Sequence, residues 1–189
     1  MTRSRGRSDP PKKKRANKPR PNPIKPLSED DRARLAQAEF NLAMIHLGEA
    51  EKLAAWSEAP NACVHAAYYA MHHCARAAIL KSGGVGKRRD VPNSHEHVIE
   101  HYGNLVEGET NYLGESAREL NKARSERVKA DYGIVVSGAT REDAAYTAGE
   151  ARRFVEACAR RWTLIQVTDY GEWLSLNKDA LNAATRTSK

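Results

Sequence analysis

Residues 60–82 read PNACVHAAYYAMHHCARAAILKS, and this stretch decides the fold class. Apolar residues recur in it at every third or fourth position, which is the spacing of one face of an α-helix. Pro60 suits the first turn of a helix, and the pair Gly83–Gly84 is typical of a helix end. We therefore predict a long helix over residues 60–82. Its apolar stripe consists of Val64, Ala67, Tyr68, Met71, Cys74, Ala75 and Ala78.

The same spacing predicts four more helices, over residues 28–56, 95–106, 111–131 and 141–166. The apolar stripe of the first of them consists of Leu35, Ala38, Leu42, Ile45 and Ala50. Ser28, Ser94 and Thr140 precede three of these helices, where a side-chain oxygen caps the free backbone N–H groups. The two β-like runs in the chain are too short to build a sheet. Five helices joined by mostly short links predict an all-α fold, an antiparallel bundle of about five helices.

The first 26 residues differ from the rest of the chain in composition. They hold ten basic residues, one acidic residue and six of the eight prolines, whereas residues 27–189 hold 21 basic and 23 acidic residues. A segment with so few apolar side chains cannot offset the entropy lost on ordering. We therefore predict a disordered basic arm over residues 1–26 and a helical domain over residues 27–168. A C-terminal tail over residues 169–189 is expected to hold a short helix near residues 173–183.

The remaining bulk features bear on the cellular environment. The three cysteines, Cys63, Cys74 and Cys158, lie in apolar helical stretches, which predicts buried, reduced thiols. No apolar run approaches the ~18–20 residues of a membrane span. The N-terminus lacks the apolar core of a signal peptide. We therefore expect a cytoplasmic protein that does not associate with membranes.

Two groups of polar residues stand at helical spacing and are candidates for a functional site. Arg127 and Asp131 are four residues apart on one helix. They form either a phosphate-binding pair or a plain exposed ion pair worth about 0.3–0.5 kcal/mol. On the helix over residues 60–82, spacings of four, three and four place four polar side chains on one face. That face lines a cleft or a dimer interface, or it packs against a neighbouring helix. The four residues are His65, Tyr69, His72 and Arg76.

Two clusters of cations are candidates for binding nucleic acid. Electrostatic attachment to RNA or DNA is the general property of a polycationic arm. The arm has no aromatic residue, so we expect no base stacking there, and a solubility tail is the alternative. The second cluster lies in a glycine-rich loop without the spacing of a P-loop, and it either binds phosphate or is a solvated loop. The two clusters are Lys12, Lys13, Lys14 and Arg15 in the arm, and Lys87, Arg88 and Arg89 in the loop.

Three histidines near the third helix raise the question of a metal site. His97 and His101 are four residues apart, but no nearby cysteine supplies a third ligand. The H-E-x-x-H pattern of zinc proteases is absent. We therefore expect neither a metal ion nor a cofactor. His95 is expected to cap or anchor the third helix and to belong to the same cleft as the polar face.

Three patches of the sequence resemble the HEPN family, in its small prokaryotic single-domain branch. They are AAYYAMHHCARAA over Ala66–Ala78, HEHVIEHY over His95–Tyr102 and RVKADY over Arg127–Tyr132. The resemblance spans residues 30–165, without the arm and the tail. It implies a helical bundle that pairs into a two-fold dimer and binds RNA. Some members are metal-independent ribonuclease toxins, encoded beside a small nucleotidyltransferase.

The resemblance also implies where a catalytic site would lie. It assigns this role to Arg127, Asp131 and Tyr132. Nuclease members keep a histidine shortly after the arginine, but here Tyr132 occupies that place and no histidine follows His101. An imidazole from the face of His65 is a candidate replacement.

Three functions follow from this pattern. The first is an RNA-associated dimeric interaction module or toxin component with weak or absent ribonuclease activity. The second is an active ribonuclease toxin paired with a nucleotidyltransferase. The third is a nucleotide-binding or nucleotide-modified regulatory domain, with Tyr132 as the modified residue.

Overall fold

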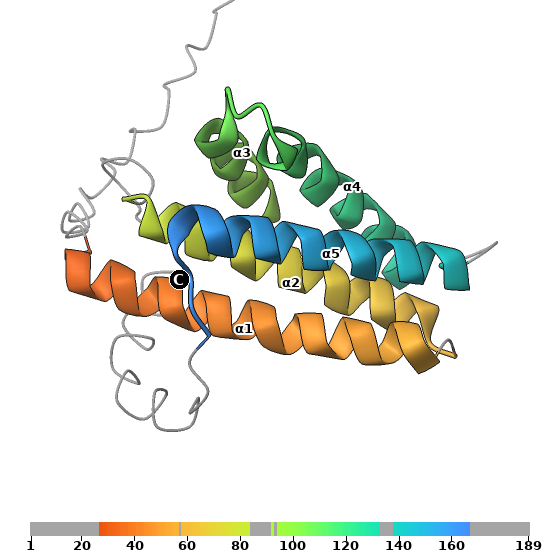
Figure 1. Ribbon diagram of the computed structural model, residues 1–189. Helices are drawn as coiled ribbons and strands as arrows, with labels where there is room; N and C mark the ends of the chain where they lie inside the picture. The colour runs from red at the N-terminus through yellow and green to blue at the C-terminus, as the bar shows by residue number, and fades with distance from the viewer. Residues whose placement is uncertain (1–26, 57, 84–91, 93, 133–137, 167–189) are drawn as a thin grey trace, which may run out of the picture.

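The computed structural model describes residues 27–166 apart from 57, 84–91, 93 and 133–137. These residues form five helices and no strand, so the prediction of an all-α bundle is confirmed (Figure 1). The helices are α1 (Glu29–Trp56), α2 (Pro60–Lys81), α3 (His95–Val106), α4 (Tyr112–Tyr132) and α5 (Arg141–Trp162).

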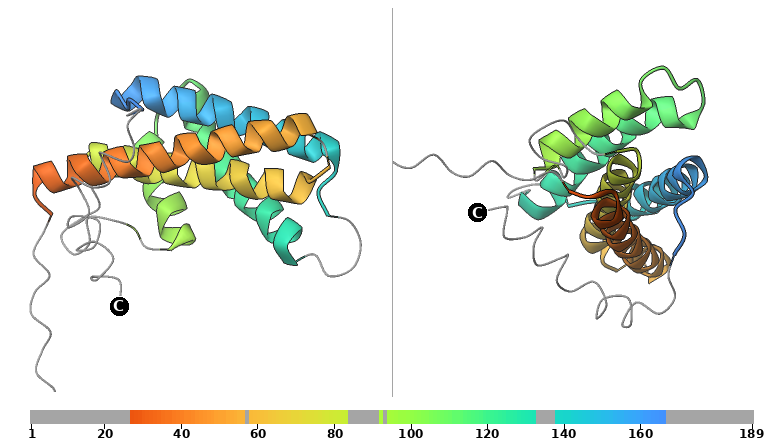
Figure 2. Two further views of the ribbon diagram at one scale, coloured as in Figure 1. Left: turned by 90° about the horizontal axis from the view of Figure 1, so that it is seen from below. Right: turned by 90° about the vertical axis from the view of Figure 1, so that its left-hand side faces the viewer.

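Helix α2 lies at the centre of the bundle and packs against each of the other four helices. Helix α1 runs antiparallel to both α2 and α5, while the α3–α4 pair crosses these three helices obliquely (Figure 2). Helix α1 contacts α2 and α5 but, within the described residues, neither α3 nor α4. Helix α2 therefore separates α1 from the α3–α4 pair and contacts both.

The apolar stripe predicted for α2 forms the middle of the core. All seven of its residues are buried, and the small alanines among them let the neighbouring helices approach closely. Around this stripe pack the rings of Tyr102 and Phe154, whose centroids lie 5.1 Å apart. The hydroxyl of Tyr102 lies 2.8 Å from Ser116 Oγ and 3.2 Å from Cys158 Sγ. All three cysteines are buried and free, in agreement with the prediction of buried thiols.

The buried face of α1 differs from the prediction. Leu35, Ala38 and Ala50 of the expected stripe are buried, but Leu42 is half-buried and Ile45 is 40% exposed. In the middle of the helix the buried residues are Phe40, Ala43 and Leu47. The stripe chosen from the sequence left out Phe40, whose large ring packs into the core and sets the rotation of the helix.

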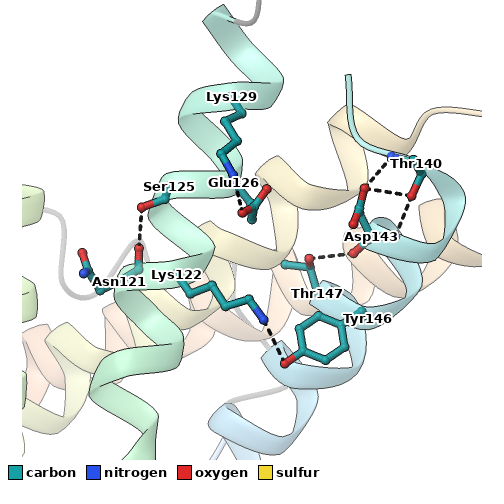
Figure 3. Close-up of polar contacts among 9 residues, drawn as sticks. All are labelled: Asn121, Lys122, Ser125, Glu126, Lys129, Thr140, Asp143, Tyr146 and Thr147. Atoms are coloured by element: carbon teal, nitrogen blue, oxygen red, sulfur yellow. Dashed lines mark hydrogen bonds and ion pairs between the residues drawn. The ribbon is translucent and has the colours of Figure 1, made fainter. Parts of the chain in front are cut away.

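Side-chain caps define where three helices begin, as predicted. Ser28 Oγ and Ser94 Oγ each accept a hydrogen bond from a backbone N–H of the first turn. At α5, Thr140 Oγ1 accepts from the Asp143 N–H at 3.1 Å, and Asp143 Oδ2 accepts from the Thr140 N–H at 2.9 Å (Figure 3). This reciprocal pair is a capping box, which satisfies two donors that the helix leaves free.

The end of α5 was predicted at residue 166, which is wrong. The helix ends at Trp162, because Thr163 adopts a left-handed backbone conformation with φ 52°. The N–H of Leu164 then donates to Ala159 O at 3.0 Å, which closes the last turn. At the end of α2, the predicted stop is present: Gly83 has a φ of 114°, a conformation that favours glycine.

Helices α4 and α5 are held together by polar contacts as well as by the core. The Lys122 ammonium lies 4.3 Å from the centroid of the Tyr146 ring and donates to the Tyr146 hydroxyl at 3.2 Å. Figure 3 shows Lys122 of α4 reaching to Tyr146 of α5. Both residues line a hollow of about 300 Å³, to which Met71 of α2 also contributes. The described cations along this hollow are already engaged, since Lys129 bonds Glu126 at 2.8 Å.

Several predictions concern residues outside the described part of the chain. These are the disordered arm with Lys12, Lys13, Lys14 and Arg15, the loop cations Lys87, Arg88 and Arg89, and the short helix near residues 173–183. Among the residues that are described, no helix combines the length and the apolar character needed to cross a membrane.

Candidate functional site

The polar face predicted on α2 is present as one continuous row. The ring centroids of His65 and Tyr69 lie 4.7 Å apart, and those of Tyr69 and His72 lie 6.2 Å apart. Residues three and four apart share a face because the helix turns once every 3.6 residues. The row is not uniformly exposed: the His65 side chain is 44% exposed, whereas His72 is only 7% exposed.

Asp131 joins this row to α4. Its Oδ2 lies 2.6 Å from Arg127 Nε, and its Oδ1 lies 3.2 Å from His65 Nδ1. The Arg127 guanidinium also lies over the Tyr69 ring, 5.6 Å from the centroid. The Arg127 side chain is 17% exposed, so the ion pair is shielded rather than fully solvated. The structure thus brings the His65 imidazole to Asp131, the carboxylate that pairs with Arg127. Tyr132 is the last residue of α4, and its side chain lies outside the description.

His72 and His95 form the inner part of the site. Their ring centroids lie 4.6 Å apart. Burial, together with the neighbouring His73, His95 and Arg76, lowers the pKa of His72 to about 2. Burial and the nearby charges of Arg127 and Arg124 also lower the pKa of His95. The lowered pKa values favour neutral imidazoles at both positions near pH 7.

His95 anchors α3 to α2, while Ser94 provides the cap. His95 Nδ1 lies 2.6 Å from the Tyr68 hydroxyl. Burial holds the pKa of Tyr68 well above its usual value, so the phenol keeps its proton. Helix α3 is in turn linked to α4 by the ion pair of Glu96 with Arg124. These contacts fix α4, and with it Arg127, against the centre of the bundle.

Helix α1 contributes a group of polar residues that the sequence did not reveal. The Glu39 carboxylate is buried, with His73 Nδ1 at 2.8 Å and Arg76 Nη2 at 3.0 Å. The His46 ring stacks on the His73 ring at 5.4 Å, and His46 Nδ1 lies 2.9 Å from Glu49 Oε2. A glutamate within an amphipathic helix carries no local signal of burial. Only the position of its partners on α2 reveals its role.

We call the rings gathered here the histidine cluster. It consists of His46 from α1, His65, His72 and His73 from α2, and His95 from α3. Each arginine beside it is paired with a carboxylate: Arg76 with Glu39, Arg124 with Glu96 and Arg127 with Asp131. Imidazoles that are hydrogen-bonded to carboxylates, next to a guanidinium, can move protons beside a bound anion.

His97 and His101 stand apart from this cluster. Both are on α3, with their ring centroids 6.4 Å apart. Within the described residues, no three histidine, cysteine or acidic side chains are placed to hold a metal ion.

A hollow of about 680 Å³ is lined in part by Asp131, the partner of Arg127. Its volume is in the ~300–1,000 Å³ range of small-molecule pockets. His65 and Asp131 line both the hollow and the site. The rest of its lining comes from α1 and from the first turns of α2: His46, Glu49, Lys52, Leu53, Asn61, Ala62 and Ala66.

Comparison with known proteins places these residues in a family. The family model of the HEPN domain matches residues 35–162, which is more than half of the 189-residue chain. The match begins in α1 and ends at the last residue of α5, so it covers the whole histidine cluster and Arg127. A search of curated proteins finds no match. The extent of the domain match, over the same five helices that build the site, shows that the chain belongs to the HEPN family.

Proposed function

We propose that this HEPN protein binds RNA at the histidine cluster, with Arg127 as the phosphate-binding residue. The observation that carries the proposal is the state of the Arg127 guanidinium. Its Nε lies 2.6 Å from Asp131 Oδ2 in an ion pair, while within the described residues none of its nitrogens makes a hydrogen bond. A guanidinium fixed on one edge presents the other as a fork of donors that matches two phosphate oxygens.

Cleavage of the bound RNA is the reaction that this arrangement favours. In a metal-independent cleavage, the ribose 2′-oxygen bonds to phosphorus while the bond from phosphorus to the 5′-oxygen breaks. A proton must leave the 2′-oxygen and another must reach the departing 5′-oxygen. His65 is the candidate proton carrier, because Asp131 orients its Nδ1 at 3.2 Å beside Arg127. It would replace the histidine that Tyr132 displaces from the family's motif.

A non-catalytic interaction module is the second candidate. It is favoured by the position of the Asp131 carboxylate, which contacts both His65 and Arg127 and partly neutralises the charge offered to a phosphate. In this version the bundle forms a homodimer and docks a partner such as a nucleotidyltransferase, while residues 1–26 attach nucleic acid by charge. The resemblance to nucleotidyltransferase-linked HEPN proteins supports the partner, and nucleotide modification of Tyr132 belongs to the same proposal.

The proposal predicts that Arg127→Ala weakens RNA binding about tenfold, the effect of losing one charge-assisted contact to phosphate. The matched control is Arg118→Ala. Arg118 is on the same helix, its side chain is 75% exposed and its nearest carboxylate oxygen lies at 3.8 Å. Binding of a labelled single-stranded RNA to the full chain, measured by fluorescence anisotropy at one salt concentration, compares the two variants. Equal affinities would remove Arg127 from the RNA site.

A further inference from the structure

We propose that the hollow lined by His65 and Asp131 is a nucleobase subsite, and that guanine is the base it takes. The inference rests on the RNA binding proposed above and adds to it the identity of one nucleotide. Its starting point is that His65 and Asp131 belong both to the hollow and to the site of Arg127. A base lying in the hollow would therefore have the adjoining RNA backbone on the side of Asp131, whose partner is Arg127.

The wall of the hollow suits the flat face of a base. Leu53 of α1 and Ala62 and Ala66 of α2 supply apolar surface, and the His65 ring stands at the inner end. Single-stranded RNA is recognised by unstacking a base and packing its face against rings and apolar side chains. The neighbouring Tyr69 fixes the orientation of the His65 ring, since the centroids lie 4.7 Å apart.

The α1 edge of the hollow carries one acceptor and one donor, one helical turn apart. These are the carboxylate of Glu49 and the ammonium of Lys52, both on exposed residues. His46 Nδ1 lies 2.9 Å from Glu49 Oε2, which leaves Oε1 and the second lone pair of Oε2 free to accept hydrogen bonds. Lys52 has no ion pair or hydrogen bond within the described residues. Asp131, the other carboxylate of the hollow, is already engaged by His65 and Arg127.

Guanine is the base whose edge matches this pair. Its N1–H and N2–H₂ groups donate side by side to a carboxylate, and its adjacent O6 accepts from an ammonium. Adenine places the lone pair of N1 where guanine has a donor, so the Glu49 carboxylate would repel it. Cytosine likewise presents N3 as an acceptor, and uracil offers a single donor between two carbonyl oxygens. A carboxylate that receives two hydrogen bonds at once therefore selects guanine, as bidentate pairs select bases in general.

The orientation of Glu49 is supported from within the bundle. His46, which holds Glu49, stacks on His73 with 5.4 Å between the ring centroids. His73 is in turn held by the buried Glu39 at 2.8 Å. These contacts hold the Glu49 carboxylate in one orientation before a ligand binds. The entropy lost by ordering its side chain on binding is therefore smaller.

The test is the affinity of the full chain for two oligouridine RNAs that differ in one central residue, guanosine or adenosine. A 2′-deoxyribose at that residue and 2′-O-methyl groups on the uridines prevent cleavage. The wild-type protein is expected to bind the guanosine oligomer about tenfold more tightly. Glu49→Gln keeps the size of the side chain and is expected to abolish this preference. Glu58→Gln, an exposed glutamate outside the hollow, serves as the control and is expected to keep it.

The remaining outcomes overturn the inference in distinguishable ways. If the wild type binds both oligomers equally and Arg127→Ala binds them more weakly, the guanine subsite is excluded and the proposed RNA binding at Arg127 is retained. Absence of RNA binding by the wild type removes both. If Glu49→Gln shifts the oligomeric state measured by sedimentation instead of the base preference, the hollow is an interface with a second copy of the chain, and the subsite is excluded.

Discussion

His65→Ala is expected to slow RNA cleavage by the full chain at least about a hundredfold, the lower end of what a positioned proton-transfer group contributes. The reason is that His65 is the imidazole hydrogen-bonded to Asp131, at 3.2 Å, and Asp131 in turn holds Arg127. Removal of the ring leaves phosphate binding by Arg127 but no group to carry the proton. The measurement is a single-turnover assay with excess protein at pH 7 and a metal chelator present.

The control for this prediction is His97→Ala. His97 is exposed on α3, and its recorded ring contact is with His101 rather than with the histidine cluster. Its rate is expected to equal that of the wild type. If His65→Ala also cleaves at the wild-type rate, His65 is not the proton carrier. If the wild type binds RNA without cleaving it, the interaction module is the correct function.

Acidification is expected to destabilise the wild type more than His72→Asn, by about 2 kcal/mol between pH 7 and pH 5. The pKa of His72 is lowered to about 2 in the folded protein, mainly by burial. In the unfolded chain it returns to about 6.5. Below that pH the unfolded state binds a proton that the folded state does not, so the free energy of unfolding falls as the pH falls. The asparagine variant lacks this titration.

Urea unfolding at the two pH values measures this difference, because all other titrating groups are common to both proteins. Equal losses of stability in the two would mean that His72 takes up its proton within the folded protein. The chemical shift of the His72 ring carbons against pH gives a second measurement on the wild type alone. A ring that titrates near pH 6 would contradict the assignment of a neutral, buried imidazole.

The helices were predictable because their signals are local. The α2 stripe lies within one element, so the period of its apolar residues is visible in the sequence and all of it is buried. The caps at Ser28, Ser94 and Thr140 depend on residues three positions away. The end of α5 was missed because the residue with the left-handed backbone conformation is Thr163. A glycine at this position would have indicated a helix end, whereas a threonine does not.

The site was only partly predictable because it joins distant parts of the chain. The spacing of Arg127 and Asp131 gave their ion pair, and the spacing on α2 gave the shared face of His65, Tyr69 and His72. The bond from His65 to Asp131 spans 66 residues, so only the packing of α4 on α2 reveals it. The buried Glu39 is a similar case, since its partners lie 34 residues or more away.

The absence of the nuclease motif's histidine from α4 does not decide the function, because the fold joins residues from distant parts of the chain. In the sequence, Tyr132 occupies the place of the expected histidine on α4. In the folded chain, an imidazole reaches Arg127 through Asp131 from α2 instead. Chemistry that a motif places on one helix can be assembled from two, provided that their packing brings the same groups together.

The central claim is that RNA lies on the histidine cluster beside Arg127, rather than only on the basic segment of residues 1–26. Photo-cross-linking of the full chain to a 4-thiouridine RNA, followed by mass spectrometry of the cross-linked peptides, tests it most directly. The account predicts cross-links on the segment of α2 that contains His65 and Tyr69. Cross-links confined to residues 1–26 would contradict it, because they would show that the arm alone holds the RNA.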